Sequence, residues 1–230
     1  AALASAEPAA FAAAPALTEP DAPPAADDLV IEIDVHALRL DETVRLELIE
    51  RGASRLWVEA ALEPGGSGIA AMPLRTGRVS TPSKPPAGGV ALSELPLTME
   101  RSTVAIRRSS AAASTLAAAL LPQAPSAACV RLSLLGISPA QPAPSCLCEA
   151  TLSLPQLLRR RDDLRRAPLQ LWERADAQRP DHPNGRPLAA VLVTLRAVET
   201  LRVLVATATA AADQLQAQQP PPASAPPPSA

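Results

Sequence analysis

The stretch Cys146-Leu-Cys-Glu-Ala-Thr-Leu-Ser-Leu154 alternates apolar and polar side chains, which is the pattern of a strand with one buried face. It continues into Leu157-Leu158 and an arginine-rich run, where we expect a short helix, and then into the extended Pro168-Leu-Gln-Leu-Trp172. The sequence His182-Pro-Asn-Gly-Arg-Pro187 follows, and its Asn-Gly pair is a strong turn signal. Residues 188–198 alternate again. Strand, short helix, strand, turn and closing strand indicate an antiparallel sheet in this part of the chain.

Similar strands recur toward the N-terminus. Residues 29–38 place apolar side chains at odd positions and Glu32, Asp34 and His36 at even positions, as a half-buried strand does. The other expected strands are residues 56–62, 90–99, 101–108 and 129–137. The 27 prolines disfavour long helices. We therefore predict an all-β, antiparallel sandwich of about eight strands, with a short helix near 155–164 and a possible helix at 200–218.

Two segments fit more than one structure. Residues 40–51 suit either a short helix or a strand. Residues 109–121 are rich in alanine, which favours a helix, whereas a sandwich needs a strand near this position and residues 115–121 would serve. Residues 73–89 are rich in Pro, Gly, Ser and Thr, and we expect a long loop there.

Composition divides the chain into three parts. Residues 1–26 are an Ala/Pro-rich segment without a basic residue, and we expect them to be disordered. Residues 27–205 hold the sandwich, with low-complexity loops between 63 and 128. Residues 206–230 pass from helix to a disordered, Pro-rich tail, whose proline runs are a weaker candidate for an SH3-type ligand.

Charge and cysteine content narrow the function classes. The formal net charge is −2, which argues against a general nucleic-acid binder. Three cysteines suggest a reducing, intracellular setting rather than a disulfide framework. Because no long apolar run lacks both charge and proline, we expect no transmembrane helix and a cytoplasmic protein.

The order of three motif groups resembles the C-terminal C2 domain of the retinitis pigmentosa GTPase regulator-interacting protein family. The first group is residues 29–38 followed by Arg55-Leu-Trp-Val-Glu59, and the second is Val130-Arg-Leu-Ser-Leu134 with residues 149–154. The third runs from residue 168 through Asn184-Gly-Arg186 to the closing strand. The match spans residues 29–204 and is patchy between 65 and 128. The resemblance implies a calcium-independent module that binds protein partners at the ciliary transition zone or basal body; other C2 domains of ciliary scaffolds are the alternative.

The residues themselves also argue against calcium. Calcium needs six to eight oxygen ligands, mostly from carboxylates. The loop after the first strand offers Asp41 and Glu42, but the opposing residues 137–145 contain no Asp or Glu. We expect no metal and no cofactor.

Five arginines form the strongest candidate for partner binding: Arg159, Arg160, Arg161, Arg165 and Arg166. Each basic residue near an anionic membrane contributes about 1 kcal/mol, so anionic lipid is one possible ligand. Asp162 and Asp163 interrupt the cluster, and Glu173 and Asp176 follow it, so a solvated face with internal ion pairs is the simplest interpretation. Of the functional interpretations, an acidic protein partner is favoured over lipid.

Trp57 and Trp172 are the other partner-binding candidates. Both fall on the face opposite the apolar stripe of their strands. An outward tryptophan is often a contact anchor, and the alternative is that a loop or tail covers each one.

We find no catalytic set. Cys146 and Cys148 should share an apolar face as buried, inert thiols, and His36 and His182 lie near no recognisable nucleophile motif. A pocket that joins either histidine to a serine and a carboxylate would reopen the question. The sequence thus predicts a non-enzymatic, calcium-independent interaction module of a ciliary scaffold; the alternative is a peripheral membrane domain that uses the arginines.

Overall fold

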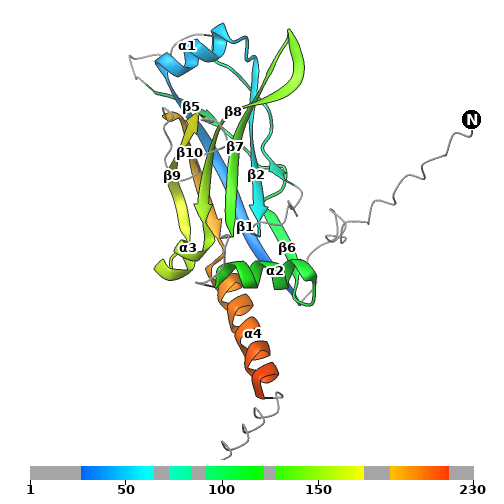
Figure 1. The fold of residues 1–230 in the computed structure, drawn as a ribbon. Coiled ribbons are helices and arrows are strands. Elements are labelled where there is room, and N and C mark those ends of the chain that lie inside the picture. The colour runs from blue at the N-terminus through cyan, green and yellow to red at the C-terminus, as the bar shows by residue number, and fades with distance from the viewer. Residues whose placement is uncertain (1–26, 65–72, 84–91, 122–127, 174–186, 218–230) are drawn as a thin grey trace, which may run out of the picture.

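The computed structural model describes residues 27–64, 73–83, 92–121, 128–173 and 187–217. The expected disorder of residues 1–26, the turn at 184–185, and the tail from 218 onward lie outside these ranges. The described part contains one curled sheet and four helices (Figure 1).

Every strand pairing within the described residues is antiparallel. The strands are β1 (Asp28–Asp41), β2 (Arg55–Glu63), β3 (Leu74–Arg75), β4 (Val79–Ser80), β5 (Leu92–Pro96), β6 (Thr103–Arg107), β7 (Cys129–Ser138), β8 (Gln141–Ser153), β9 (Leu164–Glu173) and β10 (Pro187–Arg196). Their order is β3-β2-β7-β8-β9-β10-β1-β5, with β4 beside β2 and β6 beside β1. Apart from the two-residue β3 and β4, eight strands remain, and the predicted all-β antiparallel sandwich is confirmed.

The helices decide the segments that the sequence left open. They are α1 (Glu42–Glu50), α2 (Ala111–Leu120), α3 (Leu154–Arg160) and α4 (Val198–Ala217). The Asp41 side chain caps α1 by accepting from the Val44 N–H at 2.8 Å, and Ser110 caps α2 by accepting from the Ala113 N–H at 3.2 Å, so both segments begin with a satisfied helix end. The alternative of a strand at 115–121 is wrong. The 14-residue β1 pairs with both β5 and β6, so the sheet needs no further strand there.

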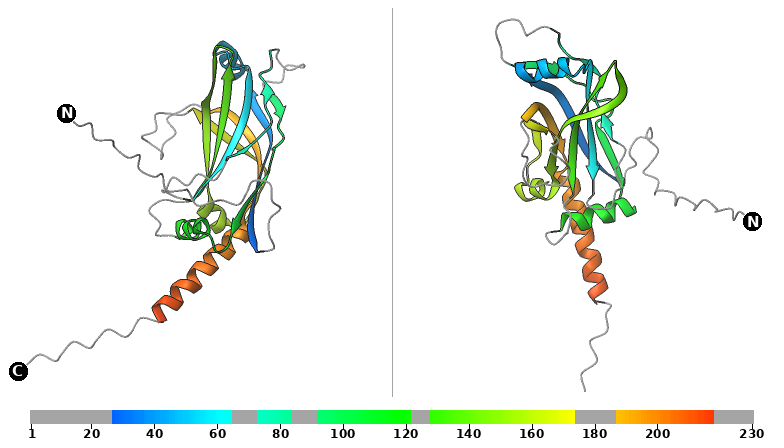
Figure 2. Two further views of the ribbon diagram at one scale, coloured as in Figure 1. Left: turned by 90° about the vertical axis from the view of Figure 1, so that its right-hand side faces the viewer. Right: turned by 45° about the horizontal axis from the view of Figure 1, so that its top comes forward.

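The sheet curls until its two ends meet. β8 and β9 are joined by only two residue pairs, and the strands diverge below them, which lets the sheet turn from one layer to the other (Figure 2). At the opposite ends of the strand order, Thr76 bridges Met99. The Gly77 N–H donates to the Thr98 carbonyl at 2.9 Å, and the Glu100 N–H donates to the Arg75 carbonyl at 2.8 Å. This closure covers backbone groups that an open edge would expose.

The core lies inside the curl and is built from aliphatic side chains. Ile31 and Ile33 of β1 pack in one cluster with Leu132 and Leu134 of β7, and all four are almost fully buried. The helices α2, α3 and α4 gather at one end of the sheet, and α1 covers the other end (Figure 1). We call these the α2–α4 end and the α1 end.

Candidate functional site

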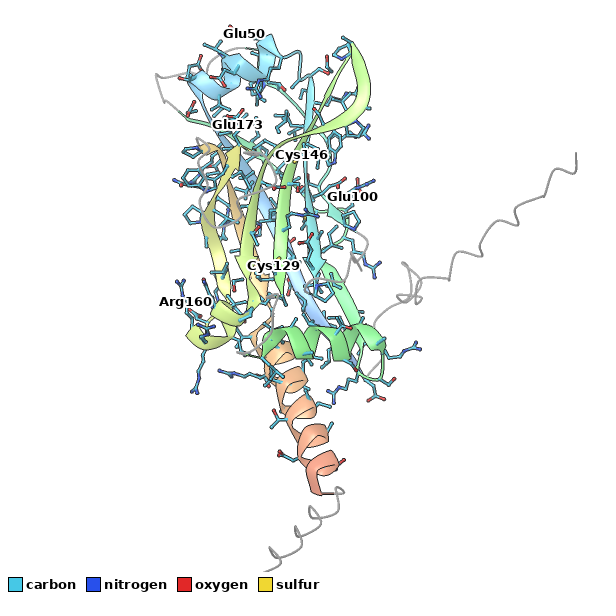
Figure 3. All side chains as sticks on the ribbon, in the orientation of Figure 1. Glu50, Glu100, Cys129, Cys146, Arg160 and Glu173 are labelled. Atoms are coloured by element: carbon cyan, nitrogen blue, oxygen red, sulfur yellow. The ribbon has the colours of Figure 1, made fainter. Side chains whose placement is uncertain are left out.

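The five arginines lie together at the corner where α3 leads into β9. α3 begins at Leu154 with Pro155 in its first turn, and its N-cap Ser153 accepts from the Gln156 N–H. It ends at Arg161, which adopts a left-handed conformation, three residues before the helix end that the sequence predicted. All five arginine side chains are exposed. Figure 3 shows Arg160 pointing away from the sheet at the α2–α4 end.

The acidic residues expected to neutralise this cluster are largely engaged elsewhere. The Asp163 carboxylate accepts from the backbone N–H groups of Ala197 and Val198, at 2.9 and 3.0 Å, and so caps the first turn of α4. Glu173 forms an ion pair with Arg51 at 3.4 Å, and it lies toward the α1 end of β9, far from Arg160 (Figure 3). Asp176 lies outside the described residues, and Asp162 is exposed. Within the described ranges, the internal ion pairs expected for these arginines are therefore not formed.

Arginines elsewhere behave differently. Ion pairs with a glutamate are made by Arg39, Arg45, Arg51, Arg75, Arg131, Arg196 and Arg202. Within the same described ranges, none of the five cluster arginines has a carboxylate within ion-pair distance. The corner is thus a concentration of positive charge that the described part of the chain leaves without anionic partners.

Trp57 is not an open anchor. It lies on the outer face of β2, as its period predicts, but only 4% of it is exposed. The Arg78 guanidinium sits 5.0 Å from the ring centroid, and the indole N–H donates to Glu59 at 3.2 Å. Of the two possibilities for Trp57, an exposed contact anchor and a side chain covered by a loop, the structure shows the second: Arg78, which follows β3, lies over the ring, so this partner-binding candidate is not exposed. Trp172 is half-buried in β9 opposite Pro187 and Glu149.

The carboxylates at the α1 end serve the fold. Asp41 caps α1, and Glu42 pairs with the buried Arg45, whose guanidinium also donates to the Pro82 carbonyl at 2.8 Å. The Arg45 hydrogen bonds hold the pKa of Glu42 below its ordinary value. Among the described residues, no group of three or more His, Cys, Asp or Glu side chains is placed to hold a metal ion.

The thiols and the histidine take structural positions. Burial raises the pKa of Cys148 well above its usual range, and burial together with Glu63 raises the pKa of Cys129 to about 11. Cys146 departs from the prediction. The β7–β8 register shifts between Leu134 and Leu135, and Cys146 is half-buried beside a cavity rather than in the core.

That cavity, of about 350 Å³, lies near the α1 end. Its described lining is Arg51, Ala53, Gly136, Ser138, Ser145, Cys146, Leu147 and Glu173, with no histidine among these residues. His36 instead shares a 2.8 Å hydrogen bond with the Thr194 hydroxyl on the outer face of the sheet, and His182 lies outside the described residues. Among the described residues, the cavity therefore does not bring together the histidine, serine and carboxylate that a hydrolase would need.

Sequence reasoning missed two residues that shape the arginine corner. Asp163 was counted as a neutralising charge, although it caps a helix that begins 35 residues later. Thr194 is 8% exposed, and its hydroxyl accepts from the Arg166 N–H at 3.2 Å. The sequence does not reveal the capping role of Asp163, because the helix that it caps is distant in the chain.

Comparisons with known proteins assign no family. A scan against protein-family models finds no match, and a search of curated proteins finds no significant match. A solved structure described as "CC2D1B coordinates ESRCT-III activity during the mitotic reformation of the nuclear envelope" superposes with a TM-score of 0.44 and 10% sequence identity. The superposition covers 78% of this chain and 61% of that one, so this chain spans less than two thirds of its length. In the described part of the chain, no helix is both long enough and apolar enough to cross a bilayer.

Proposed function

We propose that this protein is a non-enzymatic, calcium-independent interaction module, and that its arginine corner binds an acidic segment of a protein partner. One observation carries the proposal: five exposed arginines lie together between residues 159 and 166 with no described carboxylate partner, whereas several arginines elsewhere, such as Arg75, Arg131 and Arg196, pair with a glutamate. Exposed charges that the fold does not use are available to orient and select a partner.

The guanidinium group suits a carboxylate ligand. It is planar and presents several N–H donors in a fixed fork, so it can hold a carboxylate through two parallel hydrogen bonds. The large apolar side chains that are exposed in the described ranges are Leu46, Ile49 and Leu121, and none belongs to α3 or β9. A membrane-inserting surface would place such side chains among its basic residues.

A matched pair of triple variants tests this proposal. In the full chain, R159E/R160E/R165E reverses three cluster arginines, and R55E/R107E/R108E makes the same charge change at exposed arginines elsewhere. The probe is fluorescein-labelled hexaglutamate, followed by fluorescence anisotropy at two salt concentrations. The cluster variant should bind about tenfold more weakly or worse, because three positive charges that attract the acidic probe, each contributing roughly 0.5–1 kcal/mol, are reversed. The control should bind within about threefold of the wild type.

Equal losses in the two variants would mean that net charge rather than the corner drives binding, and the proposal would be abandoned. Vesicles of phosphatidylcholine with and without phosphatidylserine form a parallel arm. Sedimentation with the anionic vesicles, without hexaglutamate binding, would favour the peripheral membrane alternative.

We further propose that the partner belongs to the ciliary transition zone or basal body. Its support is the motif order shared with the retinitis pigmentosa GTPase regulator-interacting protein family. Proximity labelling in ciliated cells, with the wild type beside R159E/R160E/R165E, tests it. We expect the wild type to label transition-zone proteins and the variant to lose this labelling. Labelling of no ciliary protein would remove the ciliary assignment and leave the interaction module to the peptide assay.

A further inference from the structure

Two of the five arginines have an unusual backbone. Arg161 has a φ of 58° and Arg166 a φ of 45°, and within the described ranges they are the non-glycine residues with positive φ. The left-handed region is unfavourable for an L-residue because its Cβ crowds the neighbouring carbonyl, whereas glycine enters it freely. Such outliers persist where the surrounding structure fixes them, and they concentrate at functional sites.

The backbone of Arg161 is fixed by the end of α3. Its N–H donates to the carbonyls of Leu157 and Leu158, at 3.0 and 3.3 Å. A helix that ends in a left-handed residue usually has glycine there. Two residues later, Asp163 is tied to the start of α4, so the short segment is held at both ends.

The backbone of Arg166 is fixed by the neighbouring strand. Its N–H donates to the Thr194 hydroxyl of β10 at 3.2 Å, and the β9–β10 register shifts between Val193 and Leu195, beside Thr194. His36 of β1 engages the same hydroxyl at 2.8 Å. Three strands therefore fix a residue whose own side chain stays exposed.

The fold thus keeps arginine at two positions where glycine would cost less, and neither guanidinium has a described carboxylate partner. We infer that Arg161 and Arg166 are the specificity-determining residues of the corner, held by their fixed backbones to bind carboxylates directly, while Arg159, Arg160 and Arg165 supply long-range attraction. This inference rests on the proposed function. A group held in its bound geometry loses less entropy on binding, so these two arginines should contribute more than their charge alone.

Glycine substitution separates the inference from a simple charge effect. R161G/R166G in the full chain should raise the equilibrium constant for folding by about fivefold, as relief of left-handed strain allows. The same variant should bind labelled hexaglutamate about tenfold more weakly, because two charge-assisted contacts are lost. The control R159A/R160A removes the same number of charges at helical positions. It should lose no more than about threefold in affinity, because these two arginines supply only long-range attraction. R161K/R166K keeps both the charge and a side chain, and it should still weaken binding because lysine lacks the planar fork.

Urea denaturation and fluorescence anisotropy are the two readouts. If R161G/R166G binds as well as R159A/R160A, or if glycine destabilises the fold, the special role of these two residues is overturned. Both of those outcomes leave the proposed function intact if R159E/R160E/R165E still weakens hexaglutamate binding about tenfold, as the proposed function expects. Wild-type protein that fails to bind hexaglutamate overturns the proposed function and this inference together, whatever the denaturation curves give.

Discussion

Replacing Asp163 with alanine should loosen α4 from the body of the protein. One carboxylate oxygen accepts two backbone N–H groups, from Ala197 at 2.9 Å and from Val198 at 3.0 Å, at the helix end where the dipole also favours a negative charge. Removing a capping side chain costs about 1 kcal/mol and up to about 2 kcal/mol. Because this carboxylate serves two donors and is half-buried, we expect a loss of about 2 kcal/mol in the free energy of unfolding.

The assay is urea denaturation of D163A beside D163N and D162A. A loss of about 2 kcal/mol lowers the Tm of a domain of this size by roughly 4–8 °C. Asparagine keeps the acceptor oxygen without the charge and should lose about half as much, whereas Asp162 is exposed and its replacement should stay within about 0.5 kcal/mol. Equal stability of D163A and D162A would refute the capping role, and a D163N variant as stable as the wild type would refute its dependence on charge. Hydrogen exchange at the Ala197 and Val198 amides shows whether the loss is local to α4.

Two further predictions concern residues outside the arginine corner. Trp57→Ala should lower the free energy of unfolding by about 3 kcal/mol, because the side chain is 4% exposed beneath Arg78, with hexaglutamate binding unchanged; lost binding at full stability would restore Trp57 as an anchor. Burial and Glu63 raise the pKa of the Cys129 thiol from 9.0 to about 11, so the folded state holds this proton more tightly than the unfolded chain does. Its contribution to stability is complete below about pH 9 and declines as the pH rises toward about 11. Denaturation at pH 8, 9, 10 and 11 should show less of this decline in Cys129→Ala, and an identical decline would assign it to other groups.

Strand positions were predictable because each strand buries one face. The alternation in residues 29–38 and 148–153 indicates which side chains face the core, and β1 and β8 include these residues; Cys146, beyond the register shift, is the exception. The short helix before β9 also followed from local signals, since Pro155 and the Ser153 cap lie beside it in the sequence.

What failed depended on contacts between distant residues. The strand considered at 115–121 is absent: α2 covers Ala111–Leu120, and β1 pairs instead with β5 near one end and with β6 near the other. Trp57 is covered by Arg78, which lies in a segment expected to be loop. Local sequence does not report such contacts, so periodicity placed Trp57 on the correct face and left open whether a loop covers it.

The two ends of the sheet use charge in opposite ways. At the α1 end, Asp41 caps a helix and Glu42 pairs with buried Arg45. These charges therefore stabilise local structure. At the α2–α4 end, the Asp163 carboxylate caps α4. It is therefore engaged by backbone N–H groups and not by the arginines around it. A chain with a net charge of −2 can therefore present a strongly positive corner. Net charge argues against general nucleic-acid binding, but a ligand responds mainly to the charges that lie within about 8 Å of it at physiological salt. The site is thus defined as much by the acidic residues that the fold has already engaged as by the arginines themselves.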